Sequence, residues 1–335
     1  MIDAYRLRDS PDDLEALVDG AALHFRLPQA FVEKDFWVTE VLRAAVKDRV
    51  IADKSQRLVP VTFVFKGGTS LSRAYNLIER FSEDVDLLVV FPENCSPGAK
   101  DKILKAVCHD VGEHLGIDPQ DRRVSGAPTK GVKRHMRYHY PGSFESGVAS
   151  EGVLLEMGTR GGDFPLQVHR LRSMVADYAV EVLGELESAW QEFEPFTVNV
   201  LSPERTLLEK ISAVHDAVSR MPDATAHSAL MRGGRHFYDI HRLLSNADVL
   251  QLLIGIGPDG SAGLIEDIDG HSAAAGFSFT PRPDGGYAHS PAFQPTPDLL
   301  LEMEKSYELA TGLIYGEQPS LTDCLMTVQK AAHLL

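Results

Sequence analysis

Two aspartates follow a pair of glycines closely in the stretch FKGGTSLSRAYNLIERFSEDVDLLVVF. Asp84 and Asp86 lie two residues apart inside an apolar run, so on a strand both side chains leave the same face and can converge on one point. Two carboxylates in an apolar strand repel each other and lose hydration, which a divalent cation relieves. Magnesium is bound by a few carboxylates while it keeps waters and phosphate oxygens as its other ligands. The pair therefore predicts a magnesium site.

The glycines that precede the acids suit the binding of a phosphate. Gly67 and Gly68 let the backbone turn sharply and approach a ligand closely. Thr69 and Ser70 begin the helix expected next, and Lys66 precedes the turn, so amide, hydroxyl and ammonium groups are available for phosphate oxygens. Alone, paired glycines usually mark a turn, and Asp-x-Asp is common on surfaces. When the glycine pair and the acid pair occur in one strand-turn-helix-strand unit, they predict a nucleoside triphosphate site with its metal ligands facing it.

The elements around this stretch alternate between strands and helices over the first 200 residues. Apolar runs bounded by turn residues predict strands, and apolar residues at helical spacing predict helices. Strands are expected at 61–65, 85–91, 131–140, 152–160 and 196–202, and helices at 10–25, 27–48, 69–78 and 98–116. Further helices are expected at 203–220, 235–255, 296–314 and 321–335. The pattern predicts an α/β (α+β) fold with a mainly helical C-terminal part.

A length of 335 residues is enough for two domains. We expect an α/β domain with N-terminal helices at residues 1–200 and a mainly helical domain at 201–335. Residues 257–297 are rich in Gly, Pro, Ser and Asp, which predicts a long loop there, with a hairpin at 281–290 or a mobile flap.

The composition argues against several classes of protein. A formal net charge of -15 disfavours a general nucleic-acid coat, although it leaves room for a local basic groove. Three scattered cysteines without CxxC spacing indicate neither a zinc site nor a disulfide framework. The sequence shows no signal-peptide pattern, and its apolar runs are too short for a bilayer. We therefore expect a cytoplasmic protein without a membrane partner.

The segments KGGTSLSRAY and RFSEDVDL resemble the signature of the AbiEii/MenT family of nucleotidyltransferase toxins, which belongs to the DNA polymerase β-like nucleotidyltransferase superfamily. Further matches are FVEKDFWVTEVLR, PERTLLEKISAVHDA, RHFYDIHRLL and PRPDGGYAHSPAF. The resemblance implies a nucleotidyltransferase core with a mixed sheet and a magnesium site that holds two metal ions.

The same resemblance implies roles for single residues. Asp84 and Asp86 would be the catalytic metal pair, and Glu156 in VLLEMG would be the third metal ligand unless it is an ordinary solvent-facing glutamate. Lys210 would neutralise the triphosphate and its departing pyrophosphate, unless it belongs to a solvated helix face. Asp239 would be a second catalytic aspartate that positions Lys210 or the nucleotide.

Other residues near these motifs have two interpretations each. Arg235 would contact phosphate, although in a helix it can equally pair with Asp239 four residues on. Ser82 suggests regulation, because its phosphorylation would add about -1.5 to -2 charges beside the metal and the triphosphate; otherwise it is a plain hydroxyl. Lys34 and Asp35 match the family, but the sequence alone predicts that they lie on a solvated helix face.

For function, the resemblance implies transfer of a nucleoside monophosphate, often a pyrimidine nucleotide, from an NTP to the 3′ end of tRNA, with release of pyrophosphate. Such a protein blocks translation as the toxin of a toxin–antitoxin or phage-defence pair, so its partners would be an NTP, tRNA and an antitoxin protein.

The stretch KGVKRHMRYHY supports an RNA acceptor, because Lys133, Arg134 and Arg137 alternate with residues that can stack on a base. A strand with one charged face is the other interpretation. Three other functions stay open: transfer to a small molecule, transfer to a protein side chain, and a catalytically inert nucleotide-binding module.

Overall fold

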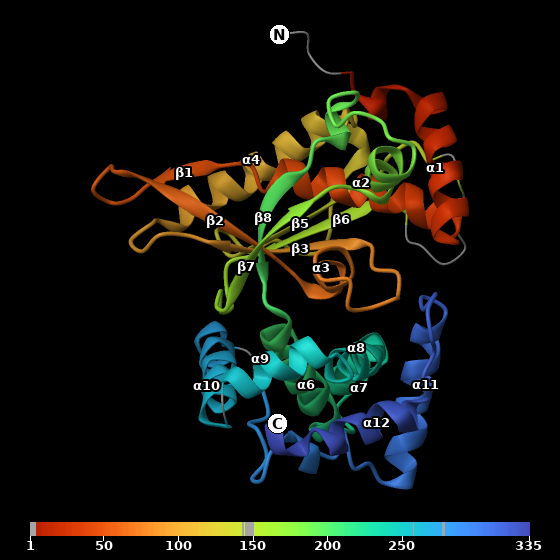
Figure 1. The fold of residues 1–335 in the computed structure, drawn as a ribbon. Coiled ribbons are helices and arrows are strands. Elements are labelled where there is room, and N and C mark those ends of the chain that lie inside the picture. The colour runs from red at the N-terminus through yellow and green to blue at the C-terminus, as the bar shows by residue number, and fades with distance from the viewer. Residues whose placement is uncertain (1–4, 143, 145–150, 257, 277–278) are drawn as a thin grey trace. The chain divides into compact units, whose positions relative to one another are not determined.

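The computed structural model describes residues 5–142, 144, 151–256, 258–276 and 279–335. The chain forms two compact units, whose elements are labelled in Figure 1. The first comprises Met1–Ala74, Ser82–Arg160 and Gln167–Val200, and the second comprises Tyr75–Phe81, Gly161–Leu166 and Leu201–Leu335. The second unit thus includes two short segments that precede residue 201.

A mixed eight-stranded sheet lies at the centre of the first unit. Its strands are β1 (Arg49–Ala52), β2 (Leu58–Lys66), β3 (Asp84–Val90), β4 (Arg122–Val124), β5 (Lys133–Tyr138), β6 (Val153–Gly158), β7 (Leu166–Leu171) and β8 (Phe196–Leu201). Their order is β4-β5-β6-β3-β2-β8-β7, and β1 pairs with β2. β3 is antiparallel to β2 and parallel to β6, while β8 is parallel to β2. The predicted α/β fold with a mixed sheet is confirmed.

Within the described residues, three helices of the first unit begin and end close to the predicted positions, one is shorter than predicted, and one was not predicted. All five helices have the following bounds. They are α1 (Pro11–Phe25), α2 (Gln29–Ala45), α3 (Gly67–Arg73), α4 (Pro97–Leu115) and α5 (Met174–Asp177). In α4, Ser96 Oγ accepts a hydrogen bond from the Ala99 amide, and Gly116 ends the helix in the left-handed conformation. The shorter helix is α3, for which the sequence predicts an end at residue 78 but which ends at Arg73, because the residues after Ala74 fold as part of the second unit. The helix that the sequence does not predict is α5.

The sheet has one apolar and one polar face where β3 carries its acids. Val85 and Leu87 are buried, whereas Asp84 and Asp86 are only partly covered. Helices α2 and α4 pack together, α2 against β3 and β6, and α4 against β1 and β5 (Figure 1). Because neighbouring residues of a strand project to opposite faces, the two aspartates lie on the face that α2 and α4 leave uncovered.

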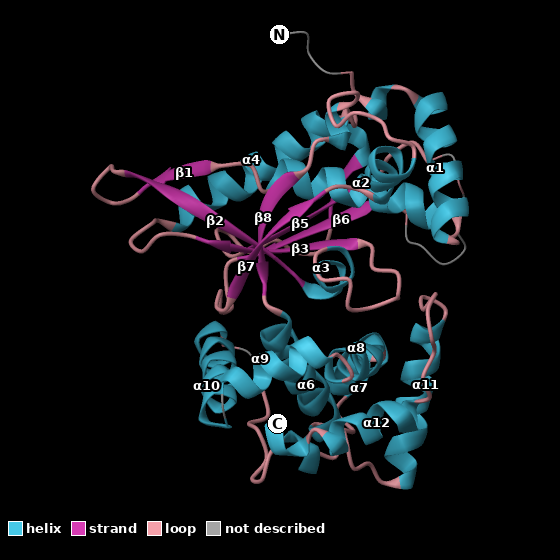
Figure 2. Cartoon of the chain, in the orientation of Figure 1, coloured by secondary structure: helices cyan, strands magenta, loops and turns pink. Residues whose placement is uncertain are grey.

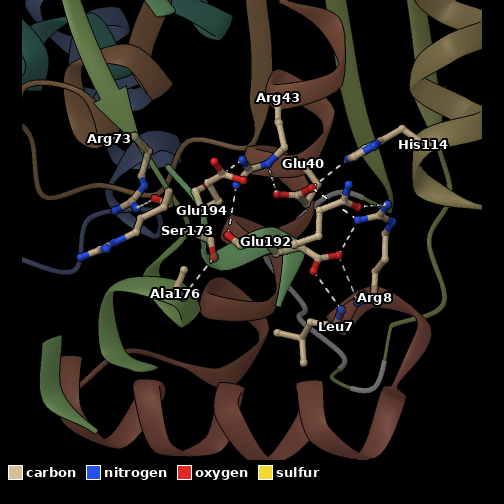
Figure 3. A network of polar contacts seen from close by, with 12 residues as sticks. Leu7, Arg8, Glu40, Arg43, Arg73, His114, Ser173, Ala176, Glu192 and Glu194 are labelled. Atoms are coloured by element: carbon tan, nitrogen blue, oxygen red, sulfur yellow. Dashed lines mark hydrogen bonds and ion pairs between the residues drawn. The ribbon is translucent and has the colours of Figure 1, made fainter. Parts of the chain in front are cut away.

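A buried polar network ties the N-terminal segment to the helices of the first unit (Figure 3). The Arg8 guanidinium contacts the Glu192 carboxylate, and Glu192 Oε2 also accepts a hydrogen bond from the Leu7 amide at 2.9 Å. Glu40 is fully buried and accepts from Arg43 Nε at 2.8 Å. Its other carboxylate oxygen lies 2.8 Å from Nε2 of His114 in α4. The network therefore pairs two buried acids with Arg8 and Arg43 and adds a hydrogen bond between Glu40 and His114.

The second unit is mainly helical (Figure 2). Its helices are α6 (Pro203–Ser219), α7 (Ala224–Gly233), α8 (Arg235–Leu244), α9 (Ala247–Ile256), α10 (Pro258–Ala275), α11 (Pro297–Thr311) and α12 (Leu321–Lys330). Helix α6 contacts α7, α8 and α9, while α8 also packs against α12. The apolar side of α6, with Leu207, Leu208 and Ile211 fully buried, forms the centre of this unit.

The predicted loop at 257–297 is wrong for its first half, where α10 forms. Leu264, Ile265 and Ile268 are buried at helical spacing, so packing outweighs the low helix propensity of a glycine-rich segment. Gly276, with φ of 71°, stands directly after the helix. After α10, the region at 281–290 forms a turn and a short 3-10 helix rather than the suggested hairpin.

Across the described part of the chain, every helix is too short or too polar to cross a bilayer.

Candidate active site

A row of four side chains crosses the face of the sheet opposite α2 and α4. Lys66 on β2 pairs in register with Asp86 on β3, and Asp86 pairs with Glu156 on β6. His135 on β5 pairs with Glu156 in turn. Residues paired in register project from the same face with their Cβ atoms about 4.5–5.5 Å apart. Two of the three predicted metal ligands are therefore direct neighbours, with a lysine on one side and a histidine on the other.

Gly67 brings the backbone of the glycine turn against this row. Its φ of 82° lies in the left-handed region, which glycine adopts without steric cost. A Cβ atom added to Gly67 would lie 2.2 Å from Oδ2 of Asp86, far inside van der Waals contact. A side chain at position 67 would therefore displace the Asp86 carboxylate. The turn thus approaches the acid pair itself, which the sequence pattern does not show.

The two hydroxyls that follow the turn are used inside the fold. Thr69 Oγ1 lies 2.6 Å from the carbonyl oxygen of Asp84 and 2.9 Å from Ser82 Oγ. Ser70 Oγ donates to the carbonyl oxygen of Gly67 at 2.9 Å. Both Thr69 and Ser70 are buried. The Thr69 bond to Asp84 fastens the turn to the strand that carries the acids, and the Ser70 bond lies within the turn itself. Contact of these two residues with phosphate stays a prediction.

Asp84 occupies the next position along the same face of the sheet. It pairs in register with Leu154, two residues before Glu156 on β6. Three carboxylates on one face supply the oxygen ligands that magnesium prefers. In the described segments, no three His, Cys, Asp or Glu side chains come close enough to hold one ion. Asp84, Asp86 and Glu156 share a face and carry the kind of oxygen donor that magnesium prefers, and their role as a joint ligand set stays a prediction.

Strand alternation divides the basic residues of β5 between the two faces of the sheet. Asp84, Asp86 and Glu156 form the acid row on β3 and β6. Lys133, His135 and Arg137 project from the same face of the sheet. Arg134 projects to the other face, where its Nη2 lies 3.4 Å from Oδ1 of Asp101 in α4. Of the three predicted RNA-binding residues, two therefore share a face with the acids, while the position of Arg134 corresponds to a structural ion pair.

His135 is a neighbour of the acid row that the sequence patterns do not reveal. Its Nδ1 lies 3.2 Å from Oε1 of Glu156. Burial lowers the pKa of His135, the charge of Lys133 lowers it further, and the charge of Asp86 opposes both. The stretch KGVKRHMRYHY contains two histidines, and neither has a spacing signal. Only the register of β5 on β6 identifies His135 as a contact of the predicted third ligand.

In the second unit, Asp239 lies in a buried cluster of cations. It accepts two hydrogen bonds from Arg80, from Nε to Oδ1 at 2.6 Å and from Nη2 to Oδ2 at 2.8 Å. Lys210 Nζ lies 2.9 Å from Oδ2 of the same carboxylate. Burial raises the pKa of Asp239, but the charges of Arg80 and Lys210 outweigh it and hold the pKa well below its usual range. Asp239 therefore stays ionised and holds Lys210, the contact on which its predicted positioning role depends.

A second contact orients Lys210. Its Nζ lies 3.4 Å from Nδ1 of His236, whose pKa is lowered well below the usual value by burial and by the charge of Lys210. The neutral imidazole can therefore accept a hydrogen bond from the ammonium group. Within the described segments, the ion pairs of Asp239 are with Arg80 and Lys210, so the alternative helix pair between Arg235 and Asp239 does not form. Phosphate binding by Arg235 stays a prediction.

A family model described as "Nucleotidyl transferase AbiEii toxin, Type IV TA system" matches residues 49–255 of this chain. The chain belongs to the AbiEii family. The matched residues include both strands of the acid row and the Lys210–Asp239 contact, so each predicted catalytic residue of this AbiEii protein lies inside the family match.

Two solved structures resemble the AbiEii chain at low sequence identity. MenT4, a nucleotidyltransferase toxin from Mycobacterium tuberculosis, is 16% identical, with 96% of this chain and 97% of that chain covered and a TM-score of 0.47. JHP933 from Helicobacter pylori is 15% identical, with 88% and 94% covered and a TM-score of 0.31. No curated protein matches the chain.

Two residues of α2 that precede the matched range, Lys34 and Asp35, are buried, which corrects the prediction of a solvated helix face. Asp35 lies 2.7 Å from Arg73 Nε and accepts a hydrogen bond from the Met174 amide at 2.6 Å. Lys34 Nζ lies 3.3 Å from Glu83 Oε2. Both residues are buried because α2 is covered along nearly its whole length by the sheet and neighbouring helices. They act as structural links within the first unit.

Proposed function

We propose that this AbiEii protein uses magnesium to transfer a nucleoside monophosphate from a pyrimidine triphosphate to the 3′ end of tRNA. Nucleotidyl transfer is the activity of the family. The observation that carries the proposal is the position of Asp86, which pairs in register with Glu156 and packs against Gly67. A triphosphate and its cation would meet at such a place, where carboxylates adjoin a tight backbone turn.

The residues of the first unit have separate tasks in this proposal. Asp84, Asp86 and Glu156 would hold magnesium, which when bound polarises the α-phosphate and stabilises the departing pyrophosphate. Lys66 stands next in the row and adds positive charge for a phosphate oxygen. His135 keeps the Glu156 carboxylate in place through its Nδ1 contact.

The transfer itself needs no protein nucleophile. The oxygen of the acceptor hydroxyl forms a bond to the α-phosphorus while the bond between the α-phosphorus and the pyrophosphate oxygen breaks. The hydroxyl proton is lost to solvent, and pyrophosphate leaves. We assign Lys210, oriented by Asp239 and His236, to neutralise the charge of the triphosphate during this step.

An RNA acceptor is supported by the face on which the basic residues lie. Lys133 and Arg137 project from the same face as the acid row, so one surface can contact both a triphosphate and a phosphate backbone. With a net charge of -15, the protein would bind RNA through this local surface rather than through its overall charge. As a toxin acting on tRNA in the cytoplasm, it would block translation until its antitoxin neutralises it.

A labelling experiment tests the proposed function. Purified protein is incubated with magnesium, each α-labelled NTP in turn and total tRNA, beside Asp86→Asn and the exposed control Asp118→Asn. We expect label on the tRNA 3′ end with CTP or UTP, in the wild type and in Asp118→Asn but not in Asp86→Asn. Label on the protein or on a small molecule, or equal label with Asp86→Asn, would contradict the proposal.

A further inference from the structure

The segment Tyr75–Phe81 connects the glycine turn to the acid pair, yet it is part of the second unit. In the chain it follows α3, which begins at Gly67, and precedes β3, which begins at Asp84. Any anchor on this segment therefore acts on the covalent link between the two motifs that the proposed transferase site needs. The contacts of the segment within the second unit show what that anchor is.

Hydrogen bonds of the main chain hold the residues on either side of Arg80. The Phe81 amide donates to the carbonyl oxygen of Leu313 at 2.8 Å, and the Glu79 amide donates to the hydroxyl of Tyr238 at 3.1 Å. The Tyr315 amide donates to the carbonyl oxygen of Glu79 at 3.0 Å. Glu79 and Phe81, which make these bonds, are the two chain neighbours of Arg80.

Arg80 is the centre of this anchor. Its side chain is 1% exposed, and its guanidinium makes the two bonds to Asp239 and a third from Nη1 to the carbonyl oxygen of Phe81 at 3.1 Å. Planar, two-point pairing of this kind fixes the orientation of a carboxylate, which a lysine cannot do. With its donors directed at protein oxygens, Arg80 is placed to hold other groups and not to contact a substrate.

The carboxylate that Arg80 fixes is the one that holds Lys210. Oδ2 of Asp239 accepts from Arg80 Nη2 at 2.8 Å and lies 2.9 Å from Lys210 Nζ. Without the guanidinium, Asp239 would be free to rotate toward the ammonium group, and the connecting segment would lose its only buried ion pair among the described residues. One side chain thus controls both the direction of Lys210 and the anchoring of the link to Asp84.

We propose that Arg80 is a positioning residue of the transferase: it locks the Asp239 carboxylate that orients Lys210 and anchors the segment that leads into Asp84. The role in transfer rests on the proposed function, whereas the anchoring does not. Asp239, in turn, acts through Arg80 and Lys210, and it is neither a metal ligand nor a general base.

Hydrogen exchange of the full chain, measured by mass spectrometry, tests the anchor without an activity assay. Arg80→Lys keeps the charge but loses the two-point pairing, so amides of peptides covering residues 75–86 should exchange about tenfold faster or more. Lys210→Met keeps the Arg80 contact and should exchange like the wild type in this segment. Arg242→Met is the matched control, because it removes the half-exposed ion pair with Glu79 from the same segment. Wild-type exchange in Arg80→Lys, or equal acceleration in Arg242→Met, would overturn the anchor.

Kinetics of labelled transfer to total tRNA tests the positioning of Lys210. Arg80→Lys should lower kcat by about 100-fold, as expected for a misplaced group, while KM for the NTP changes little. Arg242→Met should leave both constants near the wild-type values. An Arg80→Lys variant with wild-type kcat would overturn the positioning role. If the wild type labels no acceptor, the proposed function fails, and the exchange result still decides whether Arg80 anchors the segment.

Discussion

Gly67 and Asp86 are packed so closely that position 67 has no room for a side chain. An added Cβ atom would meet Asp86 Oδ2 at 2.2 Å, and the φ of 82° adds a backbone cost for any other residue. The glycine turn and the acid pair are therefore one structural element, joined further by the contact of Thr69 with the carbonyl oxygen of Asp84.

Substitution of Gly67 should consequently act on catalysis through the displaced carboxylate. We expect Gly67→Ala to lower nucleotidyl transfer by about 100-fold or more, since small displacements of reacting groups have effects of that size. The matched control is Gly158→Ala, because Gly158 lies two residues after Glu156 and an added Cβ atom meets nothing within 4 Å there. Steady-state transfer rates of the two variants test this prediction. Equal rates would show that the close packing of Gly67 against Asp86 has no catalytic role.

His135 should affect how tightly the site holds its metal. Because His135 Nδ1 contacts the Glu156 carboxylate, His135→Ala releases a predicted ligand from its orienting partner. Loss of such a partner usually weakens metal affinity by about 10-fold to 100-fold. The magnesium concentration for half-maximal transfer should rise accordingly, with most of the rate recovered at saturating magnesium. An unchanged magnesium dependence would remove His135 from the site.

Lys133 and Arg137, which project from the same face of the sheet as the acids, should contribute to RNA binding. We expect Lys133→Ala and Arg137→Ala to weaken tRNA binding and to reduce the slope of log K against log salt by about one charge each. NTP binding should stay unchanged. Lys102→Ala, an exposed lysine of α4, serves as the control for loss of charge on the opposite side of the sheet. Equal effects of Lys102 and Lys133 on tRNA affinity would argue against a defined RNA surface.

Much of this arrangement could be predicted from the sequence because it depends on local patterns. An apolar run predicts the strand β3, and the two-residue spacing of Asp84 and Asp86 predicts that they share a face. Register across strands has no local signal, so the neighbours of Glu156 could be found only in the structure. Burial is harder to predict from the sequence than strand register. The sequence predicts that Lys34 and Asp35 of α2 are solvated, because a polar pair on a helix does not reveal which partners cover it.

The same limit applies to the second unit. The resemblance pointed to Lys210 and Asp239, yet Arg80 lies more than a hundred residues before either and has no pattern in common with them. The helix at 258–275 was missed for the opposite reason, since its glycine content disfavours a helix locally while its buried apolar residues stabilise one.

Stability at low pH should depend on Glu40. Burial alone would raise the pKa of Glu40, but the hydrogen bond from His114 and the charge of Arg43 outweigh it and lower the pKa below its ordinary 4.5. The unfolded chain then binds more protons at acid pH, so this contribution is present above about pH 4.5 and is lost as the pH falls through the lower folded pKa.

Replacing Glu40 measures that contribution. Glu40→Gln should lower the free energy of unfolding at pH 7 by about 3 kcal/mol, because it leaves the buried cations of Figure 3 without their counter-charge. Glu181→Gln, which removes an exposed partner of Arg172, should cost under about 1 kcal/mol. Urea unfolding at pH 7 and pH 4 compares the variants. A Glu40→Gln protein as stable as Glu181→Gln would contradict a stabilising network.

Phosphorylation of Ser82 is predicted to switch the enzyme off. Ser82 Oγ lies 2.9 Å from Thr69 Oγ1, so a phosphate there would break the contact that fastens the glycine turn and add negative charge two residues before Asp84. Ser82→Asp should therefore reduce transfer, whereas Ser82→Ala should largely retain it. Transfer by Ser82→Asp at the wild-type rate would exclude this mode of regulation.

Binding of a divalent cation tests the central claim most directly, because it needs no acceptor. Manganese can replace magnesium as a spectroscopic probe, and its binding is followed by electron paramagnetic resonance with a CTP analogue that cannot be cleaved between the α- and β-phosphates. We predict nucleotide-dependent manganese binding by the wild type and by Asp118→Asn, and its loss in Asp86→Asn. Equal binding by Asp86→Asn would contradict the assignment of the acid row as the metal and triphosphate site.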